Sequence, residues 1–164
     1  MCNESNTLSI EINIPHQTLT LCVSGVSWLC YRVSTALNGP GERENSGCTP
    51  RGRHIIRAAI GKNQPVNSVF IGRRATGEIF SESLAELYPQ RDWILSRILW
   101  LSGCELDVNR LSNVDTMRRY IYIHGTPDTE PMGLALSHGC IRMNNHDIID
   151  LFDRVHPGIS VCIF

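Results

Sequence analysis

The feature that most constrains the fold is an alternation of apolar and polar side chains near the N-terminus, Leu8-Ser9-Ile10-Glu11-Ile12-Asn13-Ile14. A period of two places the apolar side chains on one face, which is the pattern of a half-buried β-strand. Pro15-His16-Gln17 then predicts a turn, Thr18–Val23 the returning strand, and residues 28–35 a third strand. The chain is therefore expected to begin as an antiparallel sheet that presents one face to a core.

Short strands and two helices are expected along the rest of the chain, after a polar, Gly/Pro-rich loop at residues 38–52. The strand candidates are residues 53–60, 66–72, 78–80, 120–123 and 159–164, with a turn at 75–77 between the second and third. Residues 90–101 (QRDWILSRILWL) are the best helix candidate, because their apolar side chains cover a wide face and Ser102-Gly103 can end the helix. Residues 144–155 predict another helix with Asn144 or Asn145 as its cap, and residues 112–119 a short helix or turn. These elements predict a mixed β-rich (α+β) fold, and the length of 164 residues suits a single domain over 1–164.

Composition narrows the class of protein. The net charge is −1, from 15 basic and 16 acidic residues without any block of like charge, so a nucleic-acid partner is not expected. Residues 1–6 contain no basic residue and no stretch reaches membrane-spanning length, so neither a signal peptide nor a membrane segment is expected. The seven cysteines are odd in number and lack any C-x-x-C pair, which favours free thiols in a reducing compartment. We therefore expect a cytoplasmic protein.

The segment 137–144 carries the densest chemistry, Ser137-His138-Gly139-Cys140-Ile141-Arg142-Met143-Asn144. Cys140 stands between a histidine and an arginine, and a second histidine, His124, is followed by Gly125. The thiolate is the reactive form of cysteine, and nearby cations or a helix N-terminus lower the thiol pKa while an imidazole can take the proton. Gly139 lets the backbone approach a ligand, and amides in such a turn can bind an oxyanion. This pattern predicts a nucleophilic cysteine.

The residues themselves leave two other interpretations open. His124, His138 and Cys140 could instead bind zinc, with Glu130 as the nearby candidate for a further ligand or catalytic acid. The segment could also be a structural turn. The other cysteines, and His16, His54, His146 and His156, are expected to be structural or surface residues.

Residues 124–144 resemble the L,D-transpeptidase (YkuD-type) catalytic domain family, whose signature is a His-Gly pair, a loop, and then Ser/Thr-His-Gly-Cys with an Asn shortly after. The resemblance extends to the N-terminal hairpin, Ser34-Thr35, Thr49-Pro50-Arg51-Gly52 and the closing strand, and so covers nearly the whole chain. It implies a YkuD-like β-sandwich with a few short helices and an enzyme that needs no metal or cofactor.

The resemblance also implies a role for each motif residue. Cys140 would be the nucleophile, His124 the general base, and the carbonyl of Gly125 would orient the imidazole. The amides of Gly139 and Cys140 would form an oxyanion hole, with His138 supporting the pocket. On the substrate-binding side, Arg142 would bind a carboxylate and Asn144 would brace the turn, with Ser137 beside them. Residue chemistry alone does not decide whether His124 or His138 is the base.

Family members cleave the bond between a diaminopimelate residue and the following D-Ala in peptidoglycan stem tetrapeptides, through a thioester. Because the chain shows no leader, the sequence predicts an L,D-carboxypeptidase that trims muropeptides to tripeptides during wall recycling, with water as acceptor. The alternatives are L,D-transpeptidation or D-amino-acid exchange on the same acyl-enzyme, and a non-catalytic muropeptide-binding module. A carbapenem is expected to label Cys140 and so to separate an enzyme from a binding module.

Overall fold

The computed structural model describes residues 7–164, so the predictions made on residues 1–6 lie outside the described part of the chain. Ten strands form one hydrogen-bonded sheet in the order β3-β2-β1-β10-β4-β7-β5-β6, with β8 paired to β7 and β9 paired to β8. The strands are β1 (Leu8–Asn13), β2 (Thr18–Val23), β3 (Val26–Arg32), β4 (Gly52–Ile60), β5 (Ser68–Ile71), β6 (Arg74–Ile79), β7 (Ile94–Gly103), β8 (Tyr122–Gly125), β9 (Ile141–Met143) and β10 (Ser160–Ile163). The helices are α1 (Glu82–Leu87), α2 (Asn145–Arg154) and a 3-10 turn at Ser112–Val114. None of these helices is long and apolar enough to cross a membrane.

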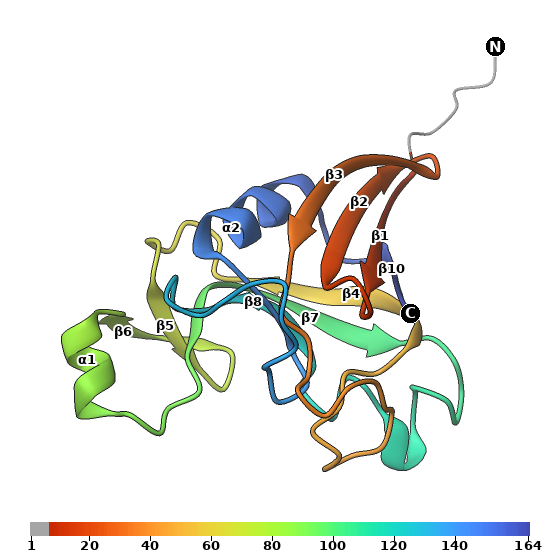
Figure 1. Ribbon diagram of the computed structural model, residues 1–164. Coiled ribbons are helices and arrows are strands. Elements are labelled where there is room, and N and C mark those ends of the chain that lie inside the picture. The colour runs from red at the N-terminus through yellow and green to blue at the C-terminus, as the bar shows by residue number, and fades with distance from the viewer. Residues whose placement is uncertain (1–6) are drawn as a thin grey trace.

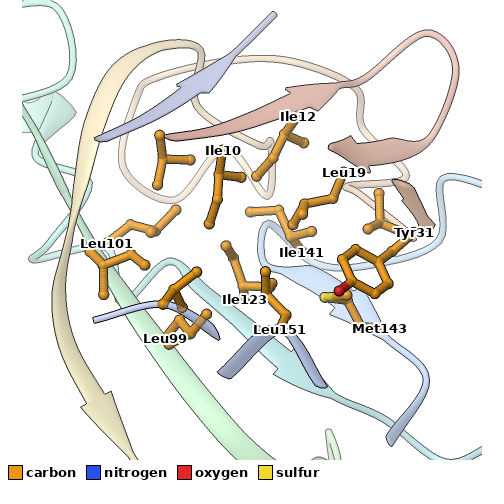
Figure 2. Close-up of a cluster of buried hydrophobic side chains, with 14 of the residues drawn as sticks. Ile10, Ile12, Leu19, Tyr31, Leu99, Leu101, Ile123, Ile141, Met143 and Leu151 are labelled. Atoms are coloured by element: carbon orange, nitrogen blue, oxygen red, sulfur yellow. The ribbon is translucent and has the colours of Figure 1, made fainter. Parts of the chain in front are cut away.

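The sheet folds back over itself and encloses a core, as Figure 1 shows, with β1, β2, β3 and β10 arching over β4 and β7. The alternating residues of the N-terminal hairpin point inward, and Figure 2 shows Ile10 and Ile12 facing the central strands across the core. The opposing side chains come from β7, β8, β9 and α2: Leu99, Leu101, Ile123, Ile141, Met143 and Leu151. Each such side chain contributes about 1.5–3 kcal/mol when fully buried. The predicted β-rich, sandwich-like fold with a few short helices is confirmed.

The helix predicted at residues 90–101 is wrong, because this segment forms β7, the central strand at Ile94–Gly103. Leu99 faces the main core, while Ile98 belongs to a smaller apolar cluster on the other face. A strand buried on both faces reads as a continuous apolar run, which periodicity cannot distinguish from a buried helix. The helix of this region is instead the short α1, whose first turn is capped by Ser81 Oγ accepting from the Leu84 amide at 3.2 Å.

Two local predictions also change. The β5–β6 hairpin turns at Gly72 and Arg73, which both have positive φ, and not at residues 75–77, which lie within β6. A three-residue strand, β9, separates Cys140 from α2, so the helix N-terminus does not adjoin the thiol and its dipole is not available there. The predicted strands of the hairpin, of 53–60, of 120–123 and of the C-terminus, and the helix of 144–155, are confirmed to within a few residues.

Candidate active site

Cys140 lies at the end of a loop, directly before β9, and its thiol rests against the start of β8. The Tyr122 amide donates to Cys140 Sγ at 3.3 Å, and Sγ lies 3.4 Å from the Tyr120 carbonyl oxygen. The half-buried side chain packs on a small apolar cluster that includes Ile98, Trp100 and Tyr122. This cluster covers the face of β7 and β8 that points away from the main core. The nucleophile candidate therefore sits on the outer face of the central strands.

The resting thiol is protonated. Burial raises the pKa of Cys140 to about 12, and the hydrogen bond from the Tyr122 amide together with Arg142 and Arg119 only partly opposes this. Asp92 adds to the rise by disfavouring the anion. The expectation that neighbouring cations lower the pKa of this thiol is therefore wrong in its net direction, because loss of hydration outweighs their attraction.

His124 lies on β8 two residues after Tyr122, so both side chains point to the same face of the strand. It is 1% exposed, and its cross-strand partner is Ile98 of the cluster that contacts Cys140. His124 Nδ1 lies 2.7 Å from the Gly125 carbonyl oxygen, which can only accept, so Nδ1 carries the proton and Nε2 keeps a free lone pair. Burial lowers the pKa of His124, so the ring is neutral at pH 7. Within residues 7–164 no hydrogen bond joins this imidazole to the thiol.

Gly125 and Asn145 hold the end of β8 in place. A Cβ at Gly125 would lie 2.5 Å from the Leu95 carbonyl oxygen, so this position has room only for glycine. The side-chain nitrogen Nδ2 of Asn145 donates to the Thr126 carbonyl oxygen at 2.8 Å, and Oδ1 of the same side chain accepts from the Ser96 hydroxyl at 2.5 Å. Asn145 is fully buried and braces both β7 and the segment after His124.

The bracing role predicted for Asn144 therefore belongs to its neighbour. Asn144 is exposed and begins α2 without a side-chain cap hydrogen bond. The sequence offered two adjacent asparagines, and only the packing of α2 against β7 and β8 decides which one turns inward.

The loop that carries Cys140 is fixed by Ser137, Gly139 and Thr49. The Ser137 hydroxyl donates to the Cys140 carbonyl oxygen at 2.5 Å and accepts from the Gly139 amide at 3.2 Å. Thr49 Oγ1 donates to the Gly139 carbonyl oxygen at 2.9 Å. Gly139 has a φ of 137°, which favours glycine.

These contacts correct two expectations. Ser137 is 1% exposed and supports the loop, so its side chain is not placed to touch a substrate. The Gly139 amide already points to the Ser137 hydroxyl, whereas the Cys140 amide donates to no atom of the described residues. Of the two amides predicted to stabilise an oxyanion, only that of Cys140 is open in this conformation.

Arg142 is the largest departure from the site predicted by the sequence. Its guanidinium is bound by two carboxylates, with Nη2 at 2.9 Å from Asp92 Oδ1 and Nη1 at 3.8 Å from Glu130 Oε2. The residue is 8% exposed, and its Nη2 also lies 3.5 Å from His138 Nδ1. The predicted carboxylate clamp thus already has anionic partners.

His138 has an exposed side chain and stands between two open pockets. One pocket, of 420 Å³, is lined by Asp92, Glu130, Arg142 and Thr126, and so adjoins the strand that carries His124. The other pocket, of 430 Å³, lies beside Tyr120 and is lined by Arg118, Arg119 and Glu44. Both pockets are therefore open beside His138.

Arg119 is a site residue that the sequence analysis missed. Its Nη1 donates to the Glu42 carbonyl oxygen at 2.8 Å and to that of Gly41 at 3.1 Å, and its Nη2 donates to the Cys48 carbonyl oxygen at 2.5 Å. It thereby ties the loop of residues 38–52 to the segment that leads into β8. No local pattern marks this arginine, because its partners lie more than seventy positions earlier in the chain.

The zinc interpretation has no set of ligands in the described part of the chain. No group of three or more His, Cys, Asp or Glu side chains among residues 7–164 is arranged to hold a metal ion. Six cysteines lie within these residues, and all six carry free thiols.

Comparison with known proteins adds a family. A model of the L,D-transpeptidase catalytic domain (YkuD) matches residues 8–163. YbiS of Escherichia coli (strain K12), described as a probable L,D-transpeptidase, is 46% identical over 43 residues, which is 26% of this chain and 14% of that protein. YkuD of Bacillus subtilis (strain 168) is 44% identical over 46 residues, 28% of each chain. These alignments thus cover between 14% and 28% of the length of the two relatives.

Solved structures share the fold at low sequence identity. L,D-transpeptidase 3 from Mycobacterium tuberculosis superposes with a TM-score of 0.58 at 16% identity, over 96% of this chain and 61% of that one. The same enzyme in complex with a faropenem-derived adduct gives a TM-score of 0.57, over 96% of this chain and 60% of that one, again at 16% identity. The L,D-transpeptidase LdtMt1 in complex with imipenem gives 0.55 at 15% identity, over 96% of this chain and 59% of that one.

Proposed function

Because the chain belongs to the L,D-transpeptidase catalytic domain family, we propose that it transfers acyl groups of peptidoglycan stem peptides through a thioester on Cys140. The observation that carries this proposal is the fixed, neutral imidazole of His124 on the strand face that also holds the thiol. A neutral thiol beside a neutral base is a pair that reacts when a carbonyl carbon arrives, without a preformed thiolate.

In the first half-reaction the substrate is a tetrapeptide whose third residue, diaminopimelate, is joined to D-Ala. Cys140 Sγ attacks the carbonyl carbon of that bond while its proton passes to His124 Nε2. The open Cys140 amide stabilises the oxyanion of the tetrahedral intermediate. When the intermediate collapses, the imidazolium returns the proton to the departing nitrogen, D-Ala leaves, and the thioester remains.

In the second half-reaction His124 takes a proton from the acceptor as the acceptor attacks the thioester. The bond between the acyl carbon and Cys140 Sγ then breaks, and the imidazolium returns the proton to the departing sulfur. An amine from another stem gives an L,D-crosslink and a free D-amino acid gives exchange, while water gives a tripeptide. The carboxypeptidase expected from the sequence is the branch in which water is the acceptor.

The expected partners follow from this chemistry. A stem tetrapeptide, free or within a muropeptide, would be the acyl donor. Carbapenems would acylate Cys140, and the relatives solved with imipenem and with a faropenem-derived adduct support that expectation. The cytoplasmic location stays a prediction from the sequence.

The test is product analysis on a defined tetrapeptide, with and without an amine acceptor. We expect release of D-Ala, a protein-bound acyl mass, and either dimer or tripeptide according to the acceptor supplied. Cys140→Ala should abolish both the release and the carbapenem adduct, whereas Cys104→Ala, which changes an exposed free thiol, should preserve them. D-Ala release by the Cys140→Ala protein, or binding of the tetrapeptide to the unsubstituted protein without release, would overturn the proposal.

A further inference from the structure

A stem peptide brings carboxylates to the site, and Arg142 is poorly placed to receive one. Asp92 and Glu130 already bind its guanidinium, and the residue is 8% exposed. A substrate carboxylate there would have to displace an existing ion pair. An available cation beside the tyrosines that contact the thiol lies in the β5–β6 hairpin.

Arg73 occupies the turn of that hairpin, and three aromatic residues fix its guanidinium. The guanidinium carbon lies 4.7 Å from the ring centre of Tyr120 and 4.9 Å from that of Trp100. Its Nη1 donates to the Tyr122 hydroxyl at 3.0 Å. Stacking and this hydrogen bond orient a side chain that would otherwise be mobile, which reduces the entropy lost on binding.

The charge of Arg73 has no carboxylate partner among residues 7–164. A guanidinium has five N–H donors, and the only hydrogen bond that Arg73 donates within those residues goes to the Tyr122 hydroxyl. The turn also holds Arg73 at a φ of 65°, a backbone region that non-glycine residues seldom adopt. The hairpin thus presents an oriented and unpaired cation.

The same two tyrosines connect Arg73 to the nucleophile. The backbone of Tyr122 and Tyr120 contacts Cys140 Sγ at 3.3 and 3.4 Å, while their side chains hold the guanidinium. Trp100 and Tyr122 also belong to the apolar cluster on which Cys140 packs. Tyr120 and Tyr122 therefore link the guanidinium to the thiol, with their backbone at Cys140 and their side chains at Arg73.

We propose that Arg73 binds a carboxylate of the acyl-donor stem peptide and makes the site select stems with that carboxylate free over stems in which it is amidated. This inference rests on the proposed function for the identity of the donor. A tetrapeptide offers three such groups near the reacting bond: the diaminopimelate side-chain carboxylate, that of the preceding residue, and the terminal carboxylate of D-Ala. All three present the same chemistry to a guanidinium.

The experiment measures binding, so it does not depend on turnover. Cys140→Ala protein is titrated by calorimetry with the unmodified tetrapeptide and with three analogues, each amidated at one of those carboxylates. We expect one analogue to bind about tenfold or more weakly, as befits the loss of a charge-assisted hydrogen bond. Adding Arg73→Gln should remove that discrimination, and Arg73→Lys should restore part of it.

Arg74→Gln is the matched control. It removes the same charge from the next residue of the hairpin, which is exposed and has no ion pair or ring contact within residues 7–164. This variant should keep the discrimination, and thermal melting should show that all variants are folded. The inference is overturned if Arg73→Gln still discriminates, if both glutamine variants lose it equally, or if no analogue binds more weakly than the unmodified peptide. A failure to release D-Ala by the unsubstituted enzyme, with discrimination intact, would instead refute the proposed reaction alone.

Discussion

Replacing His124 with alanine should leave Cys140 dependent on its own ionisation. With a thiol pKa of about 12, forming the thiolate at pH 7 costs about 7 kcal/mol, at about 1.4 kcal/mol for each of about five pH units. In the proposed mechanism the His124 imidazole takes the proton as the carbon–sulfur bond forms, so the free thiolate is never required. Loss of such a base lowers rates by about 10²–10⁴-fold.

The pH profile of D-Ala release distinguishes this mechanism from a preformed ion pair. For the unsubstituted enzyme, kcat/KM should fall at low pH through the lowered pKa of His124 and level off above it. For His124→Ala it should rise about tenfold per pH unit up to the highest pH at which the protein stays folded. A variant profile that levels off near pH 8.5, where an ordinary thiol ionises, would refute the reasoning.

His138→Ala is the natural control, because His138 is the other histidine of the motif and its side chain is exposed. It should keep the shape of the unsubstituted profile, with changes confined to KM. If this variant lost the acidic limb while His124→Ala kept it, the roles of the two histidines would be reversed.

Three further predictions concern stability. Asn145→Ala should lower the free energy of unfolding in urea by about 2–4 kcal/mol, because it leaves the buried hydrogen-bond partners of Asn145 unsatisfied. Asn144→Ala, at the exposed neighbour, should lower it by less than about 1 kcal/mol, and equal losses would contradict the assignment of the bracing role to Asn145. Burial lowers the pKa of His54 to about 4, so the unfolded state binds more protons than the folded state between about pH 6.5 and 4, and the free energy of unfolding should fall by about 3 kcal/mol on acidification over that interval. His54→Gln should reduce this pH dependence when the free energy of unfolding is measured from pH 7 to 4. Gly125→Ala should destabilise by more than about 2 kcal/mol or abolish soluble expression, since its Cβ would lie 2.5 Å from a backbone oxygen, and a normal melting temperature would contradict the packing described.

Local patterns in the sequence were sufficient for the hairpin and for the parts of the site that are close in the chain. The alternation around Ile10 and Ile12 specifies a strand because successive side chains of a strand point to opposite faces, so a period of two places every apolar side chain on the buried face. The motif around Cys140 predicts a nucleophilic thiol. Its resemblance to a family implies His124 as the base and the Gly125 carbonyl as the group that orients the ring, and that carbonyl contacts the ring in the structure. The segment of β7 is wrongly predicted as a helix because the strand is apolar on both faces. A strand between two apolar layers shows no alternation of apolar and polar residues in the sequence.

What only the tertiary structure decided is the electrostatic state of the site. The sequence predicts that Arg142 is free to bind a substrate carboxylate, but its guanidinium donates a hydrogen bond to Asp92, fifty positions earlier in the chain. The sequence also predicts that neighbouring cations lower the pKa of the Cys140 thiol, but burial raises this pKa instead. Arg73 is linked to Cys140 only through Tyr120 and Tyr122, whose side chains contact the β5–β6 hairpin. Charge pairing and hydration depend on which remote segments pack around a group, and a sequence read locally fixes the identity of the group but not its surroundings.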